Sequence, residues 1–244
     1  MTRRIGLVQT RGIGDIVIAL PISDHFIEQG FEVVWPIDER FVEIFGRVKP
    51  GVDFVGVSPG DTDYFLTEPL RVINERGCER TIILYSFLST AMVYDPRLAA
   101  SLKFDEYKYA AAGVPFRKKW DLKILRDRER EERLFDSLGV RGEYVCFHGQ
   151  SSDMQEPLDL PPAMSEGMQI VEMTRRSDDE SPFDWLLTME RAAKLVLIDS
   201  CFANLAEQLT IPVAKTFILK NPVAFTPVLK NDWKFVSVDA FRAA

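Results

Sequence analysis

Short apolar segments of strand length alternate, in the first half of the chain, with longer segments whose apolar residues recur every three or four positions. The strand-like segments span residues 4–10, 31–36, 53–57 and 81–86, and the helix-like segments span residues 14–29, 38–46 and 67–76. Strands joined by helical crossovers pair in parallel and are buried on both faces, so they are apolar throughout. This alternation constrains the fold more than any other feature, and it predicts an α/β protein.

A second alternating series begins near residue 140. Residues 96–138 are helical in pattern and include a highly charged stretch, 126–133, which is typical of a solvated helix face, with a binding patch as the alternative. Gly139 then marks a helix end. Beyond it, strands are predicted over 143–148, 169–173, 195–198 and 212–218, helices over 181–193 and 201–209, and a loop over 151–168. We therefore expect two Rossmann-like domains, residues 1–140 and 141–244.

The composition excludes several classes of protein. Hydrophobic residues make up 46% of the 244 residues, which disfavours disorder, yet no apolar run reaches the roughly 18 residues of a membrane-spanning helix. A net charge of −7 gives no strongly basic footprint for nucleic acid. Three cysteines without a CxxC pair and two histidines argue against a disulfide framework and a histidine-rich metal centre. No secretory leader is recognisable, so we expect a cytoplasmic protein without an integral membrane segment.

Two glycines mark the turn between the first strand and the first helix. Gly12 and Gly14 follow Arg11 and let the backbone turn tightly against a ligand at the positive end of the helix. The turn lacks the third glycine of a dinucleotide-binding fingerprint, and the second strand ends in Trp35-Pro36 rather than in an acid. Asp15 then has two interpretations, a first-turn acid that stabilises the helix or a ligand-facing carboxylate.

The second notable turn follows the strand over 195–198. Asp199 and Ser200 leave the end of this buried strand and open a helix at Cys201. Backbone N–H groups and a hydroxyl at a helix N-terminus can bind a phosphate. An ordinary helix cap by Asp199 or Ser200 is the alternative.

The residues of these turns resemble a known family. The pattern R-G-x-G-D-x-x-x-x-x-P, here Arg11 to Pro21, is similar to the N-terminal signature of heptosyltransferase-like glycosyltransferases, glycosyltransferase family 9. Residues 192–200 resemble the donor-site strand and turn of that family, and residues 147–152 resemble the opening strand of its second domain. The order of the motifs, their spacing and the half in which each falls agree with the family.

The resemblance implies a GT-B fold, in which two Rossmann-like domains with parallel sheets face each other across a cleft, with a reduced second domain here. It implies inverting, metal-independent transfer from a nucleotide-sugar donor, with no other cofactor. Asp15 matches the general base. The family positions imply a donor-phosphate site at Ser200, Cys201, Ser151 and Ser152, further donor or cleft residues at Asp199, Asn204, His148 and Gln150, and an acceptor-side turn at Arg11, Gly12 and Gly14.

Three positions differ from the family pattern. Cys201 stands where a glycine is usual, and Asn204 stands where a histidine is common. The lysine expected after the first strand of the second domain is absent from residues 151–160, which leaves Arg175 or Arg176 as candidate cations. A non-catalytic nucleotide- or sugar-binding protein on the same fold is therefore the alternative function.

The acceptor, the donor nucleotide and sugar, and the oligomeric state stay open at this stage. The resemblance points to a bacterial glycan as acceptor. A hydroxylated base in DNA, as modified by phage-type glycosyltransferases, is the alternative. Its support is the basic cluster Arg117, Lys118 and Lys119 beside Trp120. We favour the interpretation of this cluster as a solvated face with Trp120 as a packing anchor.

Overall fold

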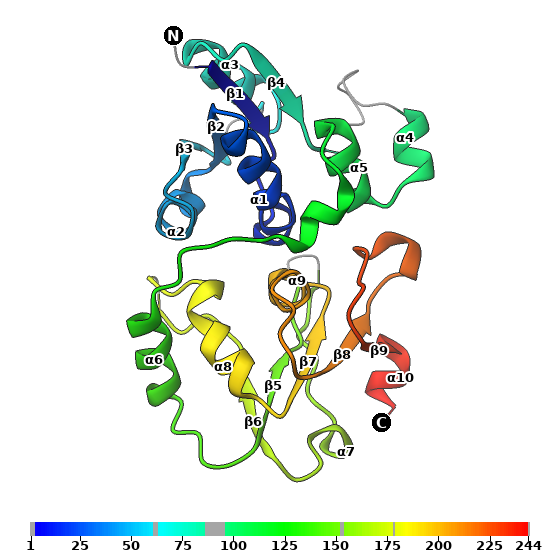
Figure 1. Cartoon of the computed structure of the whole chain (residues 1–244). Helices are drawn as coiled ribbons and strands as arrows, with labels where there is room; N and C mark the ends of the chain where they lie inside the picture. Colours follow the sequence, from blue (N-terminus) through cyan, green and yellow to red (C-terminus); the bar gives the residue numbers. More distant parts are fainter. Residues whose placement is uncertain (1–2, 61–62, 86–95, 152–153, 178, 244) are drawn as a thin grey trace. The chain divides into compact units, whose positions relative to one another are not determined.

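The computed structural model describes residues 3–60, 63–85, 96–151, 154–177 and 179–243. The chain forms two compact units, Met1–Leu125 and Arg126–Ala244, and each contains one sheet (Figure 1). Every pairing between described strands is parallel. The α/β class with two parallel sheets is therefore confirmed.

The sheet of the first unit has the strand order β3-β2-β1-β4. Its strands are β1 (Arg3–Val8), β2 (Phe31–Asp38), β3 (Val52–Val57) and β4 (Arg80–Ile83). The helical segments of this unit are α1 (Ile13–Glu28), η1 (Glu39–Phe41), α2 (Val42–Val48), α3 (Thr67–Glu75), α4 (Pro96–Ser101), α5 (Phe104–Ala112) and η2 (Phe116–Trp120).

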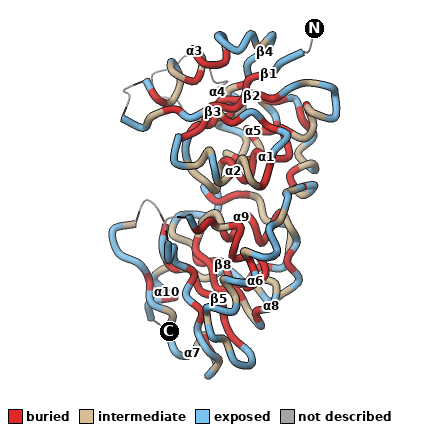
Figure 2. The backbone as a smooth tube through the Cα atoms, turned by 90° about the vertical axis from the view of Figure 1, so that its left-hand side faces the viewer, coloured by how far each residue is buried: buried red, intermediate tan, exposed pale blue. Residues whose placement is uncertain are grey.

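The crossovers of the first unit place its helices on the sheet. Helix α1 packs on β2 and α2 on β3, whereas α3 packs on β1 and β2 as the chain returns to β4. Since such crossovers are right-handed, the reversal of direction puts α3 on the opposite face from α1 and α2. Gly6 of β1 allows the close approach of α3, because a Cβ there would lie 2.4 Å from Cγ2 of Ile73. Buried residues follow the strands of each sheet (Figure 2).

The sheet of the second unit has the order β6-β5-β7-β8-β9. Its strands are β5 (Tyr144–His148), β6 (Gln169–Glu172), β7 (Lys194–Ile198), β8 (Ala214–Leu219) and β9 (Trp233–Ser237). Strand β9 was not predicted, because it is a largely exposed edge strand and lacks the continuous apolar run of the inner strands. Edge strands carry polar residues that a search for buried strands overlooks.

The helical segments of the second unit are α6 (Arg128–Ser137), α7 (Pro162–Ser165), η3 (Pro182–Trp185), α8 (Leu186–Arg191), α9 (Cys201–Gln208), η4 (Val223–Phe225) and α10 (Val238–Arg242). Within its described residues, 151 and 154–168, the predicted loop contains one short helix, α7. No helix in the described part of the chain has the length and apolar character that a membrane crossing requires.

Helix α6 docks on α8 and η3 through ion pairs. The interpretation of its charges as a solvated face therefore holds for the exposed pair Glu129 and Arg133 but is wrong for the face that carries Glu131. Glu131 is 1% exposed and accepts from Arg126 at 2.5 Å, and Arg126 also pairs with Glu190 of α8. Arg130 pairs with Asp184 of η3 at 3.1 Å. These contacts join α6 to the second unit, whereas the sequence analysis placed the division after residue 140. Alternating charges do not reveal whether their partners lie on the same helix or on a neighbouring one.

Each sheet has one position where the direction of the chain reverses. In the first unit, the chain runs from β1 outward to β3 and then returns to β4 on the other side of β1. In the second unit, the chain goes from β5 to β6 and returns to β7 on the other side of β5. Ligands of open α/β sheets bind outside the carboxyl ends of the strands at such a switch point. The two predicted turns, after β1 and after β7, both lie at these positions.

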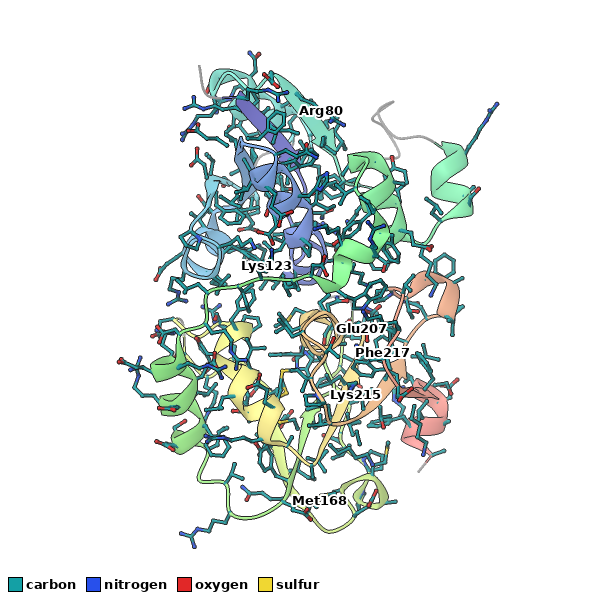
Figure 3. The ribbon with its side chains drawn as sticks, viewed as in Figure 1. Arg80, Lys123, Met168, Glu207, Lys215 and Phe217 are labelled. Carbon is teal, nitrogen blue, oxygen red and sulfur yellow. The ribbon has the colours of Figure 1, made fainter. Side chains whose placement is uncertain are left out.

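A buried glutamate of α9 fastens the segment before β9. The carboxylate of Glu207 accepts from the backbone N–H of Lys230 at 2.7 Å, from Nδ2 of Asn231 at 2.9 Å and from Nε1 of Trp233 at 2.8 Å. Figure 3 labels Glu207 on α9, near Phe217 of β8, whose ring contacts that of Trp233 edge to face. The backbone N–H, the amide and the indole N–H are all donors, so this position requires an acceptor.

Replacement of Glu207 by Gln should therefore destabilise the second unit. The amide would turn an N–H₂ group toward donors and leave a buried group without a partner, which costs about 1–3 kcal/mol. Urea unfolding followed by tryptophan fluorescence measures the loss. Glu132→Gln, which removes the same charge from an exposed position of α6, should change stability by less than about 0.5 kcal/mol. Equal stabilities of the two variants would contradict this role of Glu207.

Candidate functional site

A tyrosine hydroxyl links the two strand ends at the switch point of the first unit. Thr10 follows β1 and Tyr85 follows β4, and the backbone N–H of Thr10 donates to the Tyr85 hydroxyl at 2.8 Å. The Thr10 hydroxyl lies 2.6 Å from the same oxygen. Burial raises the pKa of Tyr85, so its hydroxyl stays protonated. The carboxyl ends of β1 and β4 are thus fixed to each other beside the glycine turn.

Gly12 sets the direction of the turn. It precedes the first residue of α1 with a φ of 80°, a left-handed conformation that favours glycine. A Cβ at Gly12 would lie 2.7 Å from Oδ2 of Asp15, so the missing side chain also makes room for this carboxylate. Asp15 lies in the first turn of α1, and the capping position is Gly12. Gly14 lies inside this first turn.

Asp15 is held by a buried lysine that the sequence analysis missed. Lys108 of α5 is 2% exposed, and its Nζ lies 3.0 Å from Oδ1 of Asp15. The same ammonium donates to Oε1 of Gln9 at 2.7 Å and to the carbonyl of Leu84 at 3.3 Å. The Asp15 side chain remains 39% exposed, so it is positioned from within and still open to a ligand. The sequence did contain a signal for this lysine, since Lys108 stands between two tyrosines of α5 that are both buried.

The other polar residues near this turn contact neighbouring side chains of the protein. The guanidinium of Arg11 stacks over the ring of Phe65 at 4.8 Å. The second strand extends beyond Pro36 to Asp38, so the expectation that it ends without an acid is wrong. That acid is satisfied within the protein, because Asp38 accepts from Arg40 and from the Tyr64 hydroxyl at 3.0 Å. Asp38 is fully buried and does not offer its carboxylate to a ribose.

At the switch point of the second unit, His148 ends β5. Its Nδ1 donates to the carbonyl of Met173 at 2.6 Å, and its ring contacts that of Phe202 edge to face, with centroids 4.7 Å apart. Burial lowers the pKa of His148, so the ring is neutral near pH 7. Gln150, two residues further, is exposed. His148 thus packs β5 against the start of α9.

Ser200 occupies the N-cap position of α9, as the helix-cap interpretation expected, but its side chain does not cap the helix. Ser200 precedes α9 with an extended backbone, but its side chain makes no capping hydrogen bond. Its Oγ is buried and has no hydrogen-bond partner among the described residues. Oδ1 of Asn204, a residue that is 4% exposed, is in the same state. Buried polar atoms are normally paired, so two unpartnered atoms in the first turn of one helix indicate groups that a ligand would satisfy.

The neighbouring predicted residues have different surroundings. Asp199 is partly buried between β7 and Ser200. Burial raises the pKa of the Cys201 thiol to about 12, so the sulfur is protonated and is not a nucleophile at neutral pH. Ser152 lies outside the described residues. The sequence prediction for this turn therefore rests on Ser200 and Asn204.

Ser151 is in contact with a second lysine that the sequence analysis missed. Lys220 follows β8, and its Nζ donates to Oγ of Ser151 at 2.9 Å. The two arginines that were candidates for this cation have other partners. Arg175 donates to the carbonyl of Ser177, and Arg176 donates to Oγ of Ser137. No sequence signal identifies Lys220, because its proximity to Ser151 depends on the order of the strands.

Two further predictions concern metals and nucleic acid. No group of three His, Cys, Asp or Glu side chains in the described ranges could hold a metal ion. In the basic cluster, Lys119 is fully buried and pairs with Asp105 at 2.7 Å, while Lys118 pairs with Glu28 at 3.4 Å. The interpretation of the cluster as a solvated face therefore holds for the exposed Arg117 but is wrong for the buried Lys119.

Comparison with known proteins gives a likeness of fold. No protein-family model and no curated protein sequence matches the chain. A glycosyltransferase family 9 structure from Veillonella parvula matches with a TM-score of 0.63 at 14% identity, over 97% of this chain and 86% of that one. The E. coli ADP-heptose LPS heptosyltransferase II matches with 0.62 at 11% identity, over 98% and 93%. E. coli heptosyltransferase WaaC with ADP-2-deoxy-2-fluoro heptose matches with 0.52 at 14% identity, over 96% and 92%.

His148 should make the stability of the fold depend on pH. Its pKa in the folded state lies below the ordinary 6.5, so the unfolded chain binds a proton first as the pH falls. The stabilisation is present above about pH 6.5 and is lost as the pH falls through the folded pKa. Urea unfolding of the wild type and of His148→Gln, between pH 8 and pH 5, measures the difference. A parallel pH dependence of the two proteins would contradict the assignment.

The likeness to the solved structures extends over both units. At identities of 11–14% it establishes the arrangement of strands and helices. The resemblance first seen in the two turns is thus confirmed at the level of structure: this chain has the fold of the glycosyltransferase family 9 structures.

Proposed function

We propose that this chain is an inverting glycosyltransferase that transfers a sugar from a nucleotide-sugar donor to a hydroxyl of a glycan acceptor. In this proposal, the first unit supplies the general base, Asp15, and the second unit binds the donor through the turn at Ser200. The proposal includes transfer without a metal ion. The basic cluster of η2 is engaged in ion pairs, which favours a glycan over DNA as acceptor.

One observation carries the proposal: in each unit, the polar groups predicted to act lie at the switch point of the sheet. In the first unit, Lys108 holds Asp15 at the end of β1 while the carboxylate stays open to solvent. In the second, Ser200 and Asn204 present unpartnered polar atoms at the end of β7. A structural role alone would leave the polar atoms of Ser200 and Asn204 paired.

The chemistry fits a single displacement. The acceptor oxygen forms a bond to C1 of the donor sugar while the bond from C1 to the diphosphate oxygen breaks, and that electron pair leaves with the diphosphate. The acceptor proton passes to the carboxylate of Asp15, whose other contacts fix its direction. Attack on the face opposite the leaving group inverts C1.

The leaving diphosphate gains negative charge and must be stabilised. Helix α9 directs its first backbone N–H groups toward the end of β7, and the Ser200 hydroxyl adds a donor. Fixed donors of this kind stabilise charge that develops in the transition state. Oδ1 of Asn204 is an acceptor, so it suits a hydroxyl of the donor rather than a phosphate oxygen.

Asp15→Asn tests the base. The variant keeps the shape of the side chain but cannot accept the proton, so the turnover of transfer should fall by at least about a hundredfold. Binding of the nucleoside diphosphate, measured by calorimetry, should stay unchanged. Asp53→Asn serves as the matched control, because Asp53 also pairs with a cation, Arg76, but at an exposed position of β3. Turnover by Asp15→Asn equal to that of Asp53→Asn would remove the base assignment.

The donor is found by a thermal-shift screen of nucleoside diphosphates and their sugars, since a ligand that binds the folded state raises its melting temperature. Transfer is then assayed with the stabilising donor and a panel of glycan acceptors, with and without a chelator. We expect transfer in both conditions. Loss of transfer with the chelator would contradict metal independence. If a donor binds but is neither transferred nor hydrolysed, the non-catalytic alternative is favoured.

A further inference from the structure

Lys220 and Ser151 approach each other from strands that are not neighbours. In the sheet order, β7 lies between β5 and β8. Ser151 follows β5, Lys220 follows β8, and Nζ of Lys220 lies 2.9 Å from Oγ of Ser151. Since adjacent strands are about 4.8 Å apart, this contact spans roughly 10 Å across the carboxyl end of β7. Lys220 and Ser151 therefore follow the strands on either side of β7, the strand whose end leads to Ser200 and α9.

The polar groups at the ends of β5, β7 and β8 fit one kind of ligand. Ser151 is 9% exposed, and the hydroxyl of Ser200 and the amide oxygen of Asn204 are buried without partners among the described residues. A lysine ammonium, hydroxyl donors and helix N–H groups bind phosphate oxygens, while an amide oxygen binds a hydroxyl. A ligand that carries both phosphates and hydroxyls would satisfy the whole set.

The segment after β5 does not supply a cation of its own. Residues 151–160 contain Asp153, Glu156 and Asp159 and no basic residue. A diphosphate placed there would meet negative charge from this segment unless another element brought a cation. Lys220 comes from the end of β8 and is the cation that contacts Ser151.

We propose that Lys220 binds the diphosphate of the nucleotide-sugar donor and stabilises its charge as it leaves, in place of a lysine on the segment after β5. The inference rests on the proposed function and goes beyond it, because it assigns the cation of the donor site to a strand end two positions away in the sheet. Ser151 orients the ammonium by accepting one of its hydrogen bonds.

Lys220→Met tests this role. Dissociation constants for ADP, UDP, GDP, CDP and inorganic pyrophosphate are measured by calorimetry on the whole chain at several salt concentrations. Loss of a hydrogen bond to a charged group should weaken the binding of the preferred diphosphate by about ten- to a hundredfold. The salt dependence of binding should also become shallower, because one cation no longer contributes. Lys220→Arg should retain most of the affinity, since it keeps the charge.

Lys234→Met is the matched control. Lys234 is exposed on β9, pairs in register with Thr216 and lies toward the amino end of that strand. Its replacement removes the same charge from the same unit and should leave the affinity within about twofold. Circular dichroism and thermal unfolding of all variants check that the fold is intact.

The outcomes separate the two proposals. If the wild type binds a diphosphate and Lys220→Met binds it equally well, the assignment of Lys220 is overturned and the proposed function stands. If Lys220→Met and Lys234→Met weaken binding equally, the effect is one of net charge and the assignment is also overturned. If the wild type binds none of the five probes and transfers no sugar, the proposed function fails, and the inference fails with it.

Discussion

The reversal of strand order in a parallel sheet is the constraint on which both candidate sites depend. Crossover connections keep all strands of the sheet pointing the same way. The loops that follow the strands therefore lie together at one edge of the sheet. Where the chain reverses direction, two such loops lie side by side. Thr10 and Tyr85 occupy this position in the first unit. In the second unit, His148 ends β5 and Ser200 follows the adjacent β7. The backbone topology therefore places the polar groups before any side chain is chosen.

Buried polar contacts then fix these groups in position. Lys108 is buried, and the burial of its charge is offset by Asp15, Gln9 and the carbonyl of Leu84. Removal of one of these partners would leave the buried ammonium of Lys108 with less compensation for its charge. The Asp15 carboxylate is therefore held in one position. In the second unit the opposite holds. The unpartnered atoms of Ser200 and Asn204 have a desolvation cost that the folded chain does not recover from the described residues.

The sequence identified the two turns but not the residues that support them. Gly12, Asp15 and Ser200 stand next to strands and helices whose periodicity is plain, so their positions at strand ends could be predicted. Lys108 and Lys220 could not be placed in the same way, because each reaches its partner across the sheet or from a distant helix. The ion pairs that join α6 to α8 were missed for the same reason, as charges alternate equally on a solvated helix.

The sequence by itself determined the α/β class, the two parallel sheets and the two turns with their glycines, hydroxyls and acids. These follow from local periodicity and from backbone conformations that few residues adopt, such as the positive φ of Gly12. Only the tertiary structure decided the strand order, the extension of β2 to Asp38, and which cations lie beside Asp15 and Ser151. Those contacts join residues far apart in the chain, and their existence depends on which strands become neighbours, which no local pattern specifies.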